Sequence, residues 1–167
     1  MSAIAPETHP VTAGAIQSLE MGKGMLLNTF KYVPDDKLGY TPSETSKSAL
    51  RIAAHCAISN YGIAAMLRGE PSEISTFAQL TEYCNAEEAK FTSREQVVGA
   101  LEDSCEKVKA AIQGVSPSTF EGMVGQGELQ GPTTFFMNLP GLHMSMHSSQ
   151  IDYLQTTWGD GTPHFNG

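Results

Sequence analysis

His143 and His147 form the strongest chemical signal in this 167-residue sequence. They stand four positions apart, so on a helix both imidazoles project from one face, about one turn apart. That spacing lets two ring nitrogens converge on one cation. The apolar seam of the segment, with Phe136, Leu139 and Leu154, places the two histidines where leucine is expected. Burying two imidazoles without partners is costly, and a shared metal ion would satisfy both.

A third histidine, His55, holds a similar place in another predicted helix. Its neighbours include small residues such as Ala53 and Gly62, which let helices approach closely and leave a cavity. Three neutral imidazoles with further positions open to water are typical of a catalytic metal site. We therefore predict one divalent ion bound by His55, His143 and His147. The simpler interpretation of His55 is a hydrogen-bonded core histidine.

Several other kinds of site are excluded by the residues around these histidines. The residues between His143 and His147 include no glutamate, so the HExxH protease motif is missing. No glutamate precedes a histidine by three positions, which excludes a di-iron carboxylate bundle. Cys56 follows His55, but adjacent helix positions point about 100° apart, so we expect a packed thiol. His9 and His164 lie near the ends, where we expect solvated side chains.

Helical spacing of apolar residues recurs four times, and sustained period-2 alternation is absent. We predict helices over residues 12–32, from 43 or 45 to 68, from a Ser93 N-cap to about 113, and over 132–158. A shorter helical piece covers residues 77–89. Ser93 and Gln96 predict a capping box, and Pro140 predicts a kink or offset in the last helix. Residues 114–131 contain five glycines and predict an irregular loop.

These elements predict an all-α four-helix bundle with a short extra helix between the second and third long helices. We expect a single domain over residues 1–167, with flexible ends at about 1–10 and 160–167. Residues 52–67 and 129–151 contain no charged residue. A surface helix normally shows a charged face, so these two segments are expected to be buried on more than one side, in the core or against another subunit.

The composition of the chain indicates which binding partners and which cellular compartment to expect. The formal net charge is −8 and no Lys/Arg cluster occurs, which disfavours nucleic acid as a partner. The sequence starts without a secretory signal and contains no apolar stretch long enough to span a membrane. Its three cysteines form no CxxC pair, which favours free thiols in a reducing cytoplasm.

The motifs around the histidines resemble those of the DinB/YfiT-like proteins, a family of metal-binding four-helix bundles. The likeness rests on residues 53–55, 142–151, 152–154 and 158–160, in that order and spacing. Many family members read His-x-Gly-Gln after the second ligand, whereas this chain has Ser148-Ser149-Gln150. The resemblance implies that His55, His143 and His147 bind zinc, nickel or a similar ion, and it implies a homodimer. Three imidazoles also accept iron or copper.

Characterised relatives imply a thiol-dependent S-transferase or isomerase that uses a low-molecular-weight thiol such as mycothiol, bacillithiol or glutathione. We predict that the metal lowers the pKa of this thiol and presents the thiolate to a small electrophilic substrate. Gln150 and Asn60, each one to one and a half turns from a histidine, are candidates for orienting ligands. Two alternatives remain: a metal-dependent hydrolase that uses bound hydroxide, and a non-enzymatic stress protein that binds metal or an apolar ligand.

Overall fold

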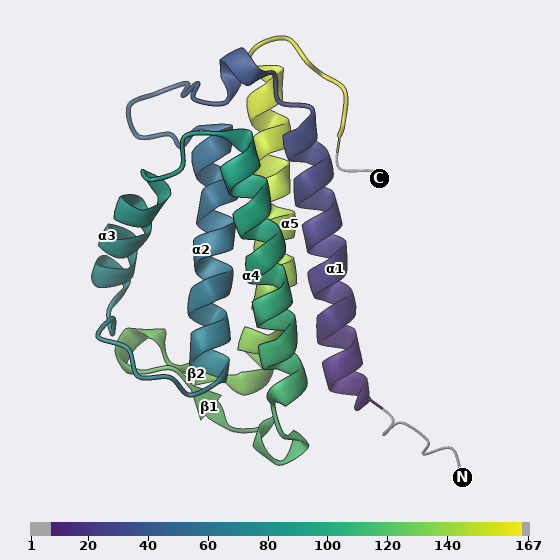
Figure 1. Cartoon of the computed structure of the whole chain (residues 1–167), viewed down its shortest axis with the longest axis vertical. Coiled ribbons are helices and arrows are strands. Elements are labelled where there is room, and N and C mark those ends of the chain that lie inside the picture. Colours follow the sequence, from purple (N-terminus) through teal and green to yellow (C-terminus); the bar gives the residue numbers. More distant parts are fainter. Residues whose placement is uncertain (1–7, 165–167) are drawn as a thin grey trace.

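Four long helices run lengthwise beside one another in a computed structural model that describes residues 8–164 (Figure 1). They are α1 Pro10–Lys31, α2 Ala49–Leu67, α4 Arg94–Gly114 and α5 Thr133–Thr156. Helices α1 and α5 run in one direction, and α2 and α4 in the other. The closest pairs are α1 with α5 and α2 with α4, and α2 also packs on α5. The predicted all-α four-helix bundle is confirmed.

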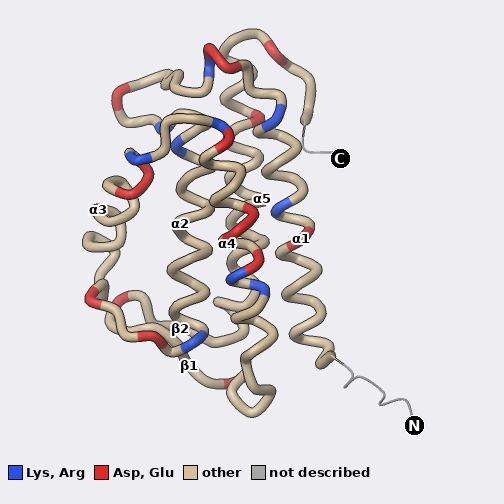
Figure 2. Tube along the Cα trace, in the orientation of Figure 1, with Lys and Arg blue, Asp and Glu red and all other residues tan. Residues whose placement is uncertain are grey.

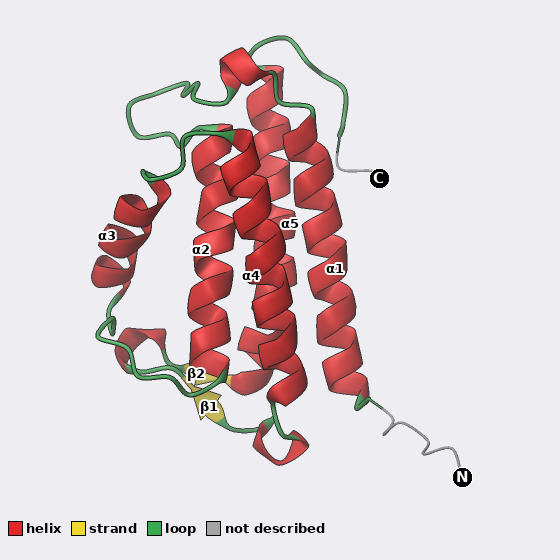
Figure 3. Cartoon of the chain, viewed as in Figure 1, coloured by secondary structure: helices red, strands yellow, loops and turns green. Residues whose placement is uncertain are grey.

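The short extra helix is α3, Phe77–Glu88, and it lies outside the bundle against α2. The expected irregular loop between α4 and α5 contains two turns of 3-10 helix, Pro117–Thr119 and Gly127–Leu129. It also contains two short strands, β1 Met123–Val124 and β2 Gly131–Pro132, which pair antiparallel (Figure 3). A third 3-10 turn, Asp35–Lys37, follows α1.

Side-chain caps fix where the helices begin. Ser93 Oγ accepts a hydrogen bond from the Gln96 backbone, as predicted. The Gln96 side chain, however, accepts from the Thr92 backbone rather than from Ser93, so the predicted reciprocal box is incomplete. The complete capping box is formed by Thr76 and Gln79 at the start of α3. Both sites have the same sequence spacing, so spacing alone did not distinguish them.

Helix α2 begins later than the predicted residue 43 or 45. Ser48 is its N-cap, and the Ser48 hydroxyl accepts from the Arg51 backbone at 3.3 Å. The serines and threonines that precede it, at residues 41–46, form turns instead. Pro140 lies inside α5, which continues on both sides of it.

Helices α1 and α5 meet backbone to backbone at Gly22 and Gly141. A Cβ atom added to Gly22 would lie 2.2 Å from the Gly141 carbonyl oxygen, and one added to Gly141 would lie 2.3 Å from the Ser18 backbone. No side chain fits at such distances. The two glycines therefore set how closely α5 approaches α1, and α5 carries two of the three predicted metal ligands.

His164, the last residue that the structure describes, is anchored to the rest of the fold. His164 stacks on Tyr32 with ring centroids 4.2 Å apart, and its Nε2 lies 2.8 Å from an Asp160 carboxylate oxygen. Its side chain is only 11% exposed. The expectation of a solvated His164 is therefore wrong, because Tyr32 and Asp160 enclose the ring. His9, in contrast, is exposed and accepts a hydrogen bond from the Val11 backbone.

The expected flexible ends fall mostly on residues 1–7 and 165–167, which lie outside the described residues. Within the described part, α1 already begins at Pro10. None of the described helices combines the length and the apolarity needed to cross a lipid bilayer.

Candidate metal centre

The structure brings the three predicted histidines together from two neighbouring helices. His55 projects from α2, and His143 and His147 project from successive turns of α5. One nitrogen of each ring lies within 4.8 Å of the others. The ring centroids of His143 and His147 are 4.4 Å apart, and that of His55 lies 5.0 and 5.1 Å from them. A single ion could contact all three rings.

The surroundings keep two of these imidazoles uncharged. Burial is the main cause that lowers the pKa of His143 to about 3, and coulombic interactions with His147, His55 and Lys47 lower it further. Burial also lowers the pKa of His147, against an opposing hydrogen bond with Gln150. Both rings are therefore neutral near pH 7, which is the state in which imidazole donates a lone pair to a metal.

His55 has a second partner that the sequence did not reveal. Its Nδ1 lies 2.9 Å from a carboxylate oxygen of Glu88 on α3. The Glu88 side chain is fully buried and also accepts hydrogen bonds from Lys47 and from Arg51. Burial raises the pKa of Glu88, but the bonds from His55 and Lys47 outweigh it and hold that pKa at about 2. Because an ionised carboxylate only accepts, the proton of His55 must sit on Nδ1, which leaves Nε2 free.

Gln150 acts on His147 in a similar way. Its side-chain oxygen lies 2.7 Å from His147 Nδ1, which places the His147 proton on Nδ1 and leaves Nε2 as the donor atom. Asn60, the other predicted orienting residue, is fully buried. Its amide contacts Ser104 and Cys105 of α4 and the Met144 sulfur of α5, and among the described residues it forms no hydrogen bond with a histidine.

The histidines lie at the edge of the core rather than in its centre. The fully buried stripe of α5 passes through Met137, Met144 and Ile151, one position away from the predicted seam. His143 and His147 are half-buried, and Gln150 is exposed. The prediction of the seam was wrong because apolar residues surround most of this helix, so spacing could not select the inward stripe. Met146, which lies between the two histidines, is 60% exposed.

The donor set fits a divalent transition metal. The Nε2 atoms of His143 and His147 lie 3.0 Å apart, and the same nitrogen of His55 is free to join them. Among the described residues His143 Nδ1 is buried and has no hydrogen-bond partner. Imidazole nitrogen is the usual protein ligand for zinc, nickel and copper. Three such donors would leave coordination positions for a further ligand.

Comparison with known proteins identifies the family. Residues 18–138 match the DinB superfamily. The chain belongs to the DinB superfamily. The matched range includes His55 and Glu88 and ends before His143 and His147, so the family match does not extend to the two histidines on α5.

The fold of this DinB-superfamily chain agrees with that of a solved relative. The crystal structure of a DinB-like protein, YjoA from Bacillus subtilis, superposes with a TM-score of 0.61 at 14% sequence identity. The match covers 88% of this chain and 93% of that one. At such low identity the likeness shows the fold alone. No curated protein sequence matches the chain.

Cys56, beside His55, is fully buried and unpaired. Burial, with smaller contributions from Cys105 and Glu88, raises the pKa of the Cys56 thiol far above its usual range. A nucleophilic cysteine needs the thiolate form. The DinB-superfamily chain therefore holds Cys56 as a packed thiol, as its sequence position indicated.

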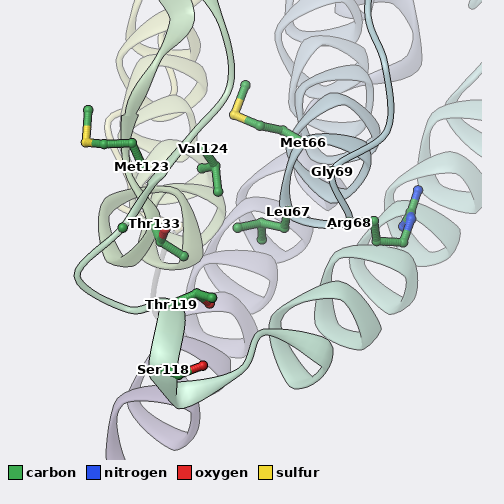
Figure 4. Close-up of a pocket in the computed structure, with 10 residues that line it drawn as sticks. Met66, Leu67, Arg68, Gly69, Ser118, Thr119, Met123, Val124 and Thr133 are labelled. Carbon is green, nitrogen blue, oxygen red and sulfur yellow. The ribbon is translucent and has the colours of Figure 1, made fainter.

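A surface pocket of about 440 Å³ lies at the other end of α2, between that helix and the segment that contains β1 (Figure 4). Met66 and Arg68 line one side, and Thr119, Met123 and Thr133 line the other. None of the three histidines lines this pocket. The centre is therefore separate from it.

Proposed function

We propose that this chain binds a divalent metal ion on His55, His143 and His147 and uses it to activate a low-molecular-weight thiol. The reaction would transfer that thiol to a small electrophile or isomerise a thiol adduct. The convergence of three imidazoles from α2 and α5, of which burial keeps His143 and His147 neutral, supports the metal site. The choice of a thiol rests on the resemblance to thiol-dependent DinB/YfiT-like proteins.

The chain's own residues prepare the donor atoms. Glu88 and Gln150 hold the Nδ1 protons of His55 and His147, so both rings present Nε2 toward the centre. The bound ion would supply a Lewis acid that favours thiolate over thiol, and thiolate is the nucleophilic form. Glu88 already accepts hydrogen bonds from three cationic or ring donors. It is therefore poorly placed to act as a general base.

The local charge also favours an anionic ligand. Lys47 and Arg51 flank the centre with side chains that are 35% and 34% exposed. Glu88 offsets one of these two charges. The remaining positive charge acts electrostatically on the histidine rings, because Lys47 contributes to the lowered pKa of both His143 and His147. An approaching thiolate or carboxylate would be attracted to this position.

The three imidazole donors indicate a class of metal ions rather than one particular metal. Three imidazoles accept zinc, nickel, copper or iron, and the available ion often decides. We propose zinc or nickel as the first choice, because both occur with neutral nitrogen ligands and open positions.

The test of this function is thiol-dependent turnover. Zinc- or nickel-loaded protein is incubated with glutathione, bacillithiol or mycothiol and the electrophile monochlorobimane. We expect turnover above background with at least one thiol, loss of it in His143→Ala, and retention in His9→Ala. His9 serves as the matched control because it is exposed and far from the centre in sequence.

The other possible outcomes of this assay distinguish between the alternative functions. If no thiol gives turnover above His143→Ala, the transferase proposal is contradicted. Metal-dependent hydrolysis of an ester without any thiol would favour the hydrolase instead. Stoichiometric metal without either activity would favour a non-enzymatic binding protein.

A further inference from the structure

Helix α3 is attached to the bundle by few buried side chains. It lies outside the four long helices, with α2 as its main neighbour. Cys84 and Glu88 are its buried residues, whereas Phe77 and Tyr83 are 61% and 46% exposed. A helix with so little buried apolar surface belongs to the less stable part of a fold. The N-terminal end of α3 is held by Glu128, whose carboxylate accepts from the Phe77 backbone at 2.9 Å. The C-terminal end is attached to α2 through the turn that contains Glu88.

The contacts of Glu88 are polar and concentrate at one end of α2. Lys47 and His55 approach one carboxylate oxygen, and Arg51 Nε lies 3.2 Å from the other. Arg51 also donates to the Asn85 carbonyl oxygen at 3.2 Å. A fully buried carboxylate is stable only when such partners satisfy it. One of these partners, His55, is a ligand of the proposed metal centre.

We propose that Glu88 is the positioning residue of the histidine centre, and that α3 delivers it, so that metal binding and the docking of α3 on α2 stabilise each other. The inference rests on the proposed metal centre. A carboxylate that accepts from the Nδ1 proton of a histidine fixes the ring orientation and directs the Nε2 lone pair at the metal. Thermodynamic linkage makes this coupling reciprocal. If docking of α3 raises the metal affinity by a given factor, metal binding raises the docking equilibrium constant of α3 by the same factor.

A purely structural role for Glu88 makes different predictions. The ion pairs with Lys47 and Arg51 alone could hold α3 on α2 without affecting the His55 ring. In that case neither the proton position on His55 nor the metal affinity would depend on Glu88. These two quantities therefore separate positioning from simple attachment.

The matched pair of variants is Glu88→Gln and Glu87→Gln. Both remove one negative charge from neighbouring positions of α3. Glu87 pairs with Lys90 at the surface, with a side chain 30% exposed, and so serves as the control. Circular dichroism and thermal unfolding establish that both variants fold.

The first measurement is the tautomer of His55 in metal-free protein, read from ¹⁵N-histidine NMR shifts. We expect Nδ1-protonated His55 in the wild type and in Glu87→Gln. In Glu88→Gln we expect a mixture of both tautomers, because the neutral amide can either accept from Nδ1–H through its oxygen or donate to an unprotonated Nδ1 through its nitrogen. An Nε2-protonated His55 in the wild type would overturn the inference. This reading needs only the wild type, so it holds even if Glu88→Gln does not fold.

The second measurement is zinc affinity, by competition with a chromophoric chelator. We expect zinc to bind about 10- to 100-fold more weakly to Glu88→Gln than to the wild type. Glu87→Gln should match the wild type. Zinc binding that is lost in His55→Ala but unchanged in Glu88→Gln would leave the metal centre intact and overturn the inference. Absence of zinc binding by the wild type would overturn both.

The third measurement is amide hydrogen exchange of residues 77–88 with and without zinc. We expect saturating zinc to slow exchange across α3 in the wild type and in Glu87→Gln. In Glu88→Gln the exchange of α3 should be fast and insensitive to zinc. Unchanged exchange of α3 in zinc-saturated wild type would contradict the coupling.

Discussion

The Nε2 atoms of His143 and His147 face each other at 3.0 Å on successive turns of α5. Two neutral imidazoles at this distance can share at most one proton, because two facing lone pairs repel and two facing protons clash. Gln150 places the His147 proton on Nδ1. The third ring, His55, points at the same position from α2. A cation bound by all three rings accounts for this arrangement.

Metal addition should stabilise the folded chain. Zinc or nickel at about 100 times the dissociation constant should raise the free energy of unfolding by about 2.7 kcal/mol, because the assembled site exists only in the native state. Thermal unfolding after chelation and after metal addition measures this change. Magnesium, which prefers oxygen ligands, serves as the control ion and should have no effect. A His55→Ala variant that gains as much stability from zinc as the wild type would contradict the site.

Replacing Gly141 by alanine should be strongly destabilising. The new Cβ would lie 2.3 Å from the Ser18 backbone, so α1 and α5 must separate. We expect a loss of at least about 2 kcal/mol in the free energy of unfolding, measured with urea. Gly24→Ala is the control: nothing lies within 4 Å of its added Cβ, and alanine at a helical position should add roughly 0.5–1 kcal/mol. Equal stabilities for the two variants would contradict the backbone contact.

The three cysteines should resist modification in the native state. All are buried, and burial raises the pKa of the Cys105 thiol to about 11. At pH 8 its thiolate fraction is then about one in a thousand. Reaction with Ellman's reagent should be slow and should accelerate with pH without levelling off below about pH 11. Denatured protein should expose three thiols. A thiol of the folded protein that reacts rapidly at pH 7 would contradict this expectation and would make that cysteine a candidate nucleophile.

We expect a homodimer, as the family resemblance implies. Figure 2 shows few charged residues along α2 and α5, and α5 exposes Leu142, Met146 and Tyr153. Introducing a charge on that face with Met146→Glu should yield monomers in size-exclusion chromatography with light scattering. Met21 on α1 is equally exposed, at 60%, so Met21→Glu is the control and should stay dimeric. A monomeric wild type would contradict the expectation.

The sequence predicted the fold and the histidine set because both depend on short-range spacing. Four apolar helical segments indicated the bundle, and the four-residue step from His143 to His147 placed two rings on one face of α5. His55 was predicted from its place among small residues in a second apolar helix, and the family resemblance pointed to the same residue. The inward stripe of α5 was not predicted, since an almost uncharged helix gives no polar face to mark the outside.

The role of Glu88 was not predicted from the sequence, for a different reason. It stands beside Glu87 in a short, polar helix, and nothing in the local sequence separates the fully buried carboxylate from the half-buried one. Its role depends on where α3 lies relative to α2, which is a tertiary relationship. The contact between Gly22 and Gly141 was not predicted for the same reason. In the sequence each is an ordinary helical glycine, and only the packing of α1 on α5 shows that they meet.

The metal content of the purified protein tests the three-histidine site without any assay of activity. Protein purified without a histidine tag is analysed by inductively coupled plasma mass spectrometry after equilibration with zinc or nickel and removal of free ions. We expect about one ion per chain in the wild type and in His9→Ala, with near-complete loss in His55→Ala, His143→Ala and His147→Ala. Metal-free wild type, or full occupancy retained in any of those three variants, would contradict the three-histidine site.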